Sequence, residues 1–582
     1  MSMMLVANPI YIAFLGGFPD PDPLSETSLK FIKDKIGLCV GNEQSNHDQC
    51  SRLRASTAPL RLLAVIDGNL VQLAETDGQH LQYAALSYCW GSSKAIVSAR
   101  TLGSNLESRL HGFELSSLPQ TLQDSVIVAR SLSIPYIWID ALCIVQDDSD
   151  EWAIEATKMM QYYERAYITI VATIATSADE GFLVKRPSYV HLALMNAWKN
   201  EPGRALHFSY PQYLNRGETN INKSTWNSRG WTLQERLLSG RVVFFTHHGT
   251  WFECRGANWT DGKRIDSADS PRTRFPPTTS TLPNDKKSRE EGWGNQSSTT
   301  WQWYLIVKDY MARRLTYAGD RLPAISGIAA SFSRYLTADA YLIGLWRTDI
   351  CRGLLWRRLH VHLSDAGVYH HQPGDYPSWT WCGMNYKVFW PYMNYSYDNC
   401  AQLVRVEHED SAVKDPKSSL VKNTILVMSG CVFNAGALSR KPTKTRVKLR
   451  FDDDTYEMDI VEGAMGDFAF EKLTPFSAMI LVQQKEEPKL PAMIQVQQKE
   501  EPELYSLEPL DSSYPEEVFK AHGILLLQRE QLGGSVNYNS QPPVTRRFHR
   551  VGVFCIEIVE ITLASEEFME RLYRQKDTVE IT

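Results

Sequence analysis

The stretch that decides the fold is Tyr83-Ala-Ala-Leu-Ser-Tyr88, which is followed along the chain by Tyr136-Ile-Trp-Ile-Asp140 and Tyr167-Ile-Thr-Ile-Val-Ala172. Each run is short and almost wholly apolar, as expected of a strand that is covered on both faces. Between the runs the sequence predicts two helices, Leu118 to Leu132 and Glu151 to Glu164. This alternation of strands and helices predicts an α/β fold with a mostly parallel sheet and flanking helices.

Polar residues mark the start of both helices. Ser117 and Gln120 form the pattern of a capping box before the first helix. The acidic loop Asp147-Asp148-Ser149-Asp150 precedes the second helix. Negative charge there is stabilised by the positive end of the helix, so the loop indicates a helix start.

One carboxylate interrupts the apolar stripe of the second helix. The stripe consists of Trp152, Glu155, Met159 and Tyr162 or Tyr163. Because Glu155 shares this face, its carboxylate should be partly desolvated, which suits acid–base or ion-stabilising work near neutral pH. The alternative is a structural ion pair between Glu155 and Lys158 at the helix surface. Both interpretations remain open at this point.

Three segments should meet at one edge of the predicted sheet. In open α/β sheets, ligands bind beyond the carboxyl ends of the strands. That edge should hold Ser87 to Gly91, Asp140 to Asp150 and the helix start that carries Trp152 and Glu155. The sequence therefore predicts a ligand site at this edge.

Composition limits the class of protein. The net charge is −6 at pH 7 and no basic block is present, so no nucleic-acid partner is expected. The 10 cysteines have no metal-ligand spacing and indicate reduced, buried thiols of a cytoplasmic protein. The apolar start lacks the charge of a signal peptide, and no apolar run is long enough to span a membrane.

Histidines form one candidate cluster for a metal. These residues are His360, His362, His370 and His371. No cysteine or carboxylate stands at a helpful spacing beside them, so neither a metal site nor a cofactor is predicted.

The chain is expected to fall into five segments. They are a variable N-terminal lead-in at 1–80, an α/β domain at 81–260, a linker or long loop at 261–300, a Trp-rich, mixed α+β region at 301–400 and a β-rich region at 401–582. Trp346, Trp356, Trp379 and Trp381 are the expected core of the Trp-rich region.

The β-rich region contains strand-like runs and a duplicated polar loop. The runs are Thr424 to Met428, Gly523 to Leu527 and Val551 to Cys555. The loop carries Ala478 to Pro488 and, with one change, Ala492 to Pro502. Two copies do not make a repeat architecture, so no function is assigned to them.

Several long motifs occur in a fixed order. They are Tyr83-Ala-Ala-Leu-Ser-Tyr-Cys-Trp-Gly91, Leu118-Pro-Gln-Thr-Leu-Gln-Asp124, Tyr136-Ile-Trp-Ile-Asp-Ala-Leu-Cys-Ile-Val-Gln-Asp-Asp148, Arg229-Gly-Trp-Thr-Leu-Gln-Glu-Arg-Leu-Leu238 and Trp251-Phe-Glu-Cys254. Together they resemble the fungal heterokaryon-incompatibility (HET) domain proteins. The similarity continues downstream through Leu315 to Gly327 and Pro377 to Trp381.

The resemblance implies a role in non-self recognition and programmed cell death, with other incompatibility proteins or a second copy of the chain as partners. The HET domain has been likened to the flavodoxin-like Toll/interleukin-receptor (TIR) fold. Some TIR domains cleave NAD at its nicotinamide–ribose bond with a helix Glu shortly after a Trp. By that likeness Glu155 would be catalytic and would stabilise an oxocarbenium-like state. The substrate-binding residues would be Ser87, Trp90, Gly91, Asp140 and Trp152.

A second interpretation needs no enzyme. In it the HET domain is a self-associating signalling module that recruits partners. Since a fold supports many functions, the sequence alone does not decide between the two.

Overall fold

The computed structural model describes a large part of the chain and divides it into two compact units. The described residues are 19–41, 50, 58–66, 68–91, 94–186, 192–195, 205–208, 221–261, 263–265, 299–336, 341–358, 376–377, 379–384, 387–390, 397–408, 424–430, 432–441, 444–451, 454–461, 476–484, 519–528, 546–558 and 577–581. Unit 1 comprises residues 1–278 and 313–332, and unit 2 comprises 279–312 and 333–582. The histidine cluster and most of the expected linker lie outside the described residues.

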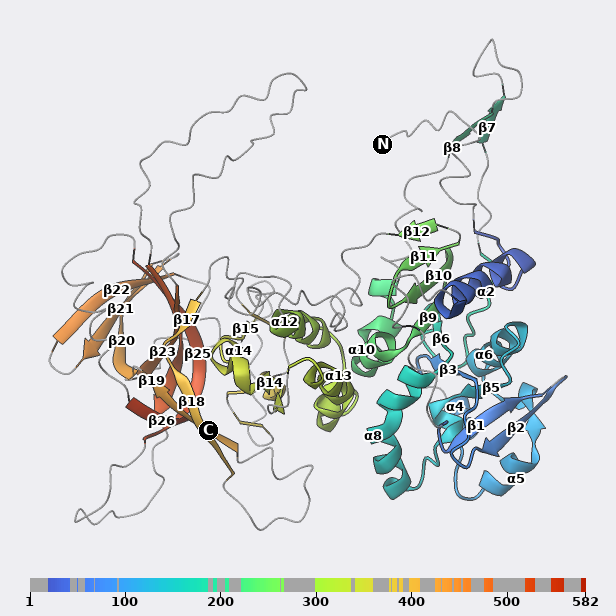
Figure 1. Ribbon diagram of the computed structural model, residues 1–582, viewed down its shortest axis with the longest axis horizontal. Coiled ribbons are helices and arrows are strands. Elements are labelled where there is room, and N and C mark those ends of the chain that lie inside the picture. The colour runs from blue at the N-terminus through green and yellow to red at the C-terminus, as the bar shows by residue number, and fades with distance from the viewer. Residues whose placement is uncertain are drawn as a thin grey trace. The chain divides into compact units, whose positions relative to one another are not determined.

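Unit 1 is built around a mixed sheet of 10 strands in the order β12-β11-β10-β9-β6-β3-β5-β1-β2-β4 (Figure 1). The strands are β1 Arg61–Val65, β2 Leu70–Glu75, β3 Tyr83–Ser87, β4 Phe113–Glu114, β5 Tyr136–Trp138, β6 Ile168–Ala172, β9 Arg241–Thr246, β10 Gly249–Cys254, β11 Asn258–Thr260 and β12 Lys263–Ile265. A separate hairpin joins β7 Leu192–Met195 and β8 Ala205–Phe208.

The helices of unit 1 are interspersed among these strands. They are α2 Glu26–Gly41, α4 Lys94–Ala99, α5 Leu106–His111, α6 Gln120–Ser131, α7 Asp140–Cys143, α8 Ser149–Arg165, α10 Gly230–Leu238 and α13 Pro323–Ser333. Residues that the sequence assigns to a variable lead-in thus hold α2, β1 and β2.

Only the centre of the sheet is parallel. The strands β5, β3, β6 and β9 pair in parallel, whereas the strands outside them pair antiparallel. The prediction of a mostly parallel sheet is therefore wrong for the sheet as a whole. The outer strands join through short turns, such as the one between Thr246 and Gly249. Antiparallel strands can be joined this way, but parallel strands cannot.

Helices cover both faces of the central strands. Leu122, Val126 and Ala129 of α6 belong to the core on one face. Tyr162 and Tyr163 of α8 belong to the core on the other. Figure 1 shows α6 and α2 on one side of the sheet and α8 and α10 on the opposite side. All residues of β3 and β6 are buried, as expected of strands covered on both faces.

The predicted capping box of α6 does not form. The N-cap of α6 is Pro119, and no side chain caps it. Ser117 lies in a short 3₁₀ turn, and its hydroxyl donates to the carbonyl of Glu114 at 2.6 Å. The N–H of Thr121 in the first turn is satisfied instead by the carbonyl of Ala178, at 2.8 Å. A loop distant in the sequence therefore supplies the hydrogen-bond acceptor that a local N-cap side chain would have supplied.

The predicted acidic start of α8 is confirmed. The carboxylate of Asp148 accepts hydrogen bonds from the backbone N–H groups of Asp150 and Glu151, at 3.0 and 2.9 Å. Such a cap satisfies donors that the first turn would otherwise leave unpaired. The helix begins at Ser149 and ends at Arg165, slightly beyond both expected limits.

Unit 2 combines short helices with strands. Its elements are α12 Thr299–Tyr310, α14 Ile350–Gly353, β13 Tyr341–Leu342, β14 Leu345–Trp346, β15 Arg357–Arg358, β16 Val388–Phe389, β17 Tyr397–Asn399, β18 Gln402–His408, β19 Thr424–Gly430, β20 Val432–Lys441, β21 Lys444–Phe451, β22 Asp454–Val461, β23 Phe476–Gln484, β24 Phe519–Gln528, β25 Arg546–Ile558 and β26 Asp577–Ile581. The predicted strand runs lie within β19, β24 and β25.

The large sheet of unit 2 closes on itself. From β23 the pairing proceeds through β20, β21, β22, β25 and β24 and returns to β23. The first copy of the duplicated loop begins in β23, and the second copy lies outside the described residues.

Tryptophans form the core of the Trp-rich region, residues 301–400. The four predicted core tryptophans, Trp346, Trp356, Trp379 and Trp381, are all buried. Their neighbour Trp303 packs edge to face on Trp346 and donates its indole N–H to the carbonyl of Gly344, at 3.0 Å. Trp381 donates to the same carbonyl at 2.9 Å. These bonds satisfy two indole N–H groups that would otherwise be buried without an acceptor.

No helix in the described part of the chain combines the length and the apolar character that crossing a membrane requires.

A buried ion pair joins α10 to the sheet of unit 1. The Nε of Arg236 donates to Oε2 of Glu253 on β10 at 3.0 Å, and the two side chains are 1% and 0% exposed. The guanidinium also lies over the ring of Phe244, 5.1 Å from its centroid. Breaking one half of such a pair leaves a charge buried without its partner.

We expect Glu253→Gln to lower the free energy of unfolding by about 3–5 kcal/mol, because Arg236 would keep its charge in the core. Urea denaturation measures the change. The matched control is Glu107→Gln, since Glu107 has an 84% exposed side chain. Its effect should stay within about 0.5 kcal/mol. Equal effects of the two substitutions would contradict a buried ion pair between Arg236 and Glu253.

Candidate functional site

The carboxyl ends of β3 and β5 bring predicted site residues together. The chain leaves β3 at Ser87 and reaches Trp90, whose indole N–H donates to Oδ2 of Asp140 at 2.9 Å. Asp140 is the first residue of α7 because β5 ends at Trp138, earlier than expected. The strand is short, and α7 turns the carboxylate toward the end of β3.

A carboxylate from α10 completes this edge. The hydroxyl of Ser87 donates to Glu235 and accepts a hydrogen bond from the indole N–H of Trp226 at 2.6 Å. Arg229 is the N-cap residue of α10, and its guanidinium donates to the carbonyl of Tyr88. We call Ser87, Trp90, Asp140, Arg229 and Glu235 the rim cluster.

Burial controls the charges of the rim cluster. The side chain of Glu235 is buried, and this burial raises its pKa to about 7, while the nearby Arg229 opposes the shift. Burial also raises the pKa of Asp140, again against the attraction of Arg229. For Arg229 burial lowers the pKa, but Glu235, Cys89 and Asp140 outweigh it and hold the pKa above its usual value. Two carboxyl groups therefore share one cation in a poorly solvated place.

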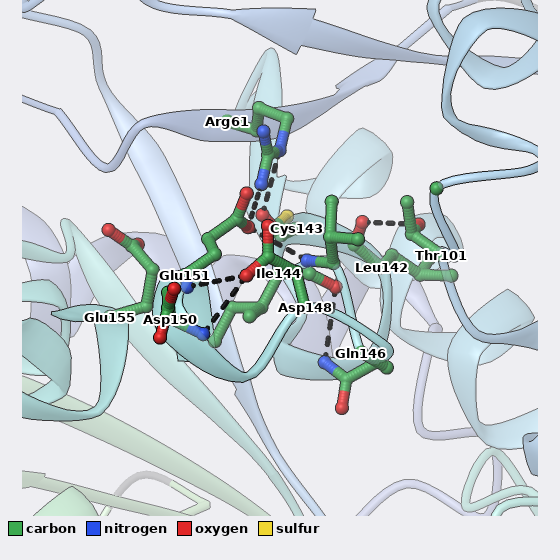
Figure 2. A network of polar contacts seen from close by, with 12 residues as sticks. Arg61, Thr101, Leu142, Cys143, Ile144, Gln146, Asp148, Asp150, Glu151 and Glu155 are labelled. Atoms are coloured by element: carbon green, nitrogen blue, oxygen red, sulfur yellow. Dashed lines mark hydrogen bonds and ion pairs between the residues drawn. The ribbon is translucent and has the colours of Figure 1, made fainter. Parts of the chain in front are cut away.

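The loop that follows β5 is held by a separate polar network, shown in Figure 2. The Nε of Arg61 donates to the carbonyl of Cys143 at 3.1 Å, and the same guanidinium pairs with Glu151. Glu151 in turn accepts the N–H of Val145 at 2.8 Å. This network holds the segment between Asp140 and Asp148, and with it the position of Asp140.

Glu155 lies apart from the rim cluster in its contacts. Its side chain is 2% exposed and accepts hydrogen bonds from the hydroxyl of Tyr162 at 2.6 Å and from Nζ of Lys158 at 3.0 Å. The alternative ion pair with Lys158 is thus present. Among the described residues, Glu155 shares no bond with Ser87, Trp90 or Asp140, and Figure 2 shows it beside the Arg61 network without a bond to it.

The remaining predicted residues are Trp152 and Gly91. Trp152 lies in the first turn of α8 with 43% of its surface exposed, so it does not form part of the core. Gly91 adopts a φ of +70°, and a Cβ there would lie 2.5 Å from Cβ of Ser177. Only glycine fits this turn, which brings the backbone after β3 against the loop after β6.

Glu235 has two arginines close to it in the sequence, Arg229 and Arg236. The structure puts Arg229 beside Glu235, whereas Arg236 pairs with Glu253. The contact with Ser87 was missed, because Ser87 and Glu235 lie far apart in the chain. Helical periodicity gives no signal for this contact, because Leu233 and Leu237 share one face of α10 and Glu235, two residues from each, faces away from them.

Three cysteines of unit 1 also converge, although the sequence predicted no metal site. The Sγ atoms of Cys39, Cys50 and Cys254 all lie within 4.8 Å of one another. Cys254 lies far from Cys39 and Cys50 in the sequence. The packing of α2 against β10 brings them together in the folded chain.

Unit 1 is therefore a doubly covered α/β domain with polar residues gathered at the carboxyl ends of its parallel strands. Residues 83–235 match the family model described as heterokaryon incompatibility protein (HET). The chain thus carries a HET domain, as its motifs predicted. No curated protein and no solved structure matches the chain.

The raised pKa of Glu235 predicts a pH-dependent stability. The folded chain keeps a proton on Glu235 up to about pH 7, whereas an unfolded chain releases it near pH 4.5. Ionisation therefore opposes folding, and the free energy of unfolding should fall as the pH rises through this window, by about 3 kcal/mol.

Replacing Glu235 by Gln should flatten this pH profile, measured as the urea-unfolding free energy between pH 4.5 and pH 8. A smaller slope should remain, because burial also raises the pKa of Asp140, and that of Asp261 to about 6. Glu107→Gln is the control and should keep the wild-type slope. A wild-type profile that rises with pH would refute the assignment.

Proposed function

We propose that the protein acts in heterokaryon incompatibility in a fungus, as a cytoplasmic effector that triggers cell death after a non-self partner is detected. We further propose that the rim cluster is its ligand site and that the ligand is NAD. The observation that carries the site is the Glu235 carboxyl group, which is bonded to Ser87, lies beside Arg229 and has a pKa of about 7.

The order of the central strands supports a nucleotide ligand. In chain order β5, β3, β6 and β9 are the second, first, third and fourth strands of the parallel centre. This is the order of flavodoxin-like sheets, and a TIR-like fold has the same arrangement. Such sheets bind nucleotides beyond the carboxyl ends of the strands, where the crossovers change side.

The rim cluster offers groups for each part of NAD. Trp90 would stack on the nicotinamide or adenine ring, and Asp140 would accept a ribose hydroxyl. Ser87 and the backbone at Gly91 would bind ribose or phosphate oxygens, with Arg229 as the cation for the phosphates. Trp152 would add a second aromatic surface at the start of α8.

The proposed reaction breaks the bond between the nicotinamide nitrogen and C1′ of the ribose. The electron pair of that bond leaves with nicotinamide, and the ribose passes through an oxocarbenium-like state that a carboxylate stabilises. Water then adds to C1′ and gives its proton to a carboxylate. By analogy with TIR domains this carboxylate is Glu155, and by the geometry of the rim it is Glu235.

A second function has its own support. Glu155 is already bonded to Tyr162 and Lys158, an arrangement that suits a structural role. On the same helix, Trp152 and Ile154 are 43% and 54% exposed. Both side chains could bury apolar surface against a partner at the start of α8. This favours a self-associating, non-enzymatic module whose contact surface begins at the start of α8.

If the enzymatic proposal holds, purified protein consumes NAD when assembled, and the product assay detects free nicotinamide. Substitution of the catalytic carboxylate by Gln should lower the rate about 100-fold or more. Comparing Glu155→Gln with Glu235→Gln identifies the residue. Glu107→Gln is the control and should retain the rate. If NAD stays intact with wild-type protein at every concentration tested, the enzymatic proposal is lost.

If self-association carries the signal, the double variant Trp152→Ser with Ile154→Ser should weaken it, because the contact surface loses its apolar area. Light scattering measures the assembly, and viability after expression in a fungal cell measures the signal. Val97→Ser is the control, since Val97 is 52% exposed on another helix. Assembly and killing that survive the double substitution would exclude this surface.

A further inference from the structure

Three buried thiols meet at the end of β10. Cys39 comes from α2, Cys254 ends β10, and Cys50 lies between α2 and β1 in the chain. Their exposed fractions are 1%, 0% and 2% for Cys39, Cys50 and Cys254. All three Sγ atoms lie within 4.8 Å of one another. In a tetrahedral zinc site with Zn–S bonds of about 2.3 Å, two sulfurs lie roughly 3.8 Å apart, so small movements would close the triad on one ion.

Sγ of Cys254 has two backbone contacts. After β10 the chain turns back into β11, the N–H of Gly256 donates to Sγ of Cys254 at 3.3 Å, and the carbonyl oxygen of Ala257 lies 3.5 Å from the same sulfur. N–H groups that point at a sulfur are the outer contacts that orient and stabilise metal-bound ligands.

Charge compensation decides which ligand the triad can take. Three buried thiolates within 4.8 Å of one another would repel each other strongly, whereas a bound divalent ion deprotonates and neutralises its thiol ligands. Arg241 adds positive charge, since its guanidinium donates to the carbonyl of Cys50 at 3.1 Å.

We propose that Cys39, Cys50 and Cys254 bind one zinc ion, with a fourth ligand from outside this set. Thiolate ligands favour zinc over the harder divalent cations. The ion would fasten α2 and the segment at Cys50 to β10. Its role is structural and separate from the rim cluster, so it does not depend on the proposed reaction.

Metal analysis of the full-length chain tests the site. Protein purified without chelators should contain about one zinc ion per chain by mass spectrometry. Cys39→Ser and Cys254→Ser should each lose at least about 90% of that zinc, since a site with two protein thiolates binds far more weakly. The control is Cys143→Ser, because Cys143 is a buried thiol of the same unit whose Sγ also accepts a backbone N–H, at 3.4 Å.

A second measurement uses only the wild-type protein, so it remains informative if the cysteine variants fail to fold. Wild-type protein loaded with cobalt should show the ligand-field bands of a tetrahedral ion and thiolate-to-cobalt charge-transfer absorption, and added zinc should abolish both. Absence of these bands, together with wild-type protein that binds no zinc on reconstitution, would overturn the proposal. Detection of a disulfide among the three cysteines in fresh, metal-free wild-type protein would also overturn it.

Discussion

The structure of unit 1 depends on the need to cover both faces of its parallel central strands. Every residue of β3 and β6 is buried, so neither face of the sheet centre can be left to solvent. The chain meets this need with α6 on one face and α8 on the other, and it crosses the sheet between them. Because β5, β3, β6 and β9 pair in parallel, their carboxyl ends lie at the same edge of the sheet. The rim cluster is a consequence of that packing.

Hydrogen bonds within the protein hold the side chains of the rim cluster in place. Ser87 bonds to both Trp226 and Glu235, and Trp90 bonds to Asp140. Buried polar groups are costly unless they are satisfied, so these bonds stabilise the edge of the sheet. A ligand of the kind proposed would have to offer equal hydrogen bonds in exchange. Glu235 is the member whose charge changes most readily, because its carboxyl group gains or loses a proton near neutral pH.

The sequence predicted the centre of the HET domain well, since local patterns decide it. The apolar runs at β3 and β6 and the acidic N-cap of α8 all lie where expected. Features that depend on distant residues were missed. The carbonyl of Ala178 replaces the expected cap of α6, Glu235 reaches Ser87, and Cys254 reaches Cys39. Periodicity and spacing carry no information about such pairs.

The segment that matches the HET family model, residues 83–235, forms only part of the sheet of unit 1. Strand β5 pairs with β1, which precedes the segment, and β6 pairs with β9, which follows it. From further downstream, the N–H of Gly327 donates to Gln234 at 2.9 Å. A recombination event that moved only residues 83–235 into another gene would therefore carry a sheet with bare edges. A transferred domain that folds must therefore include the flanking residues that supply β1 and β9.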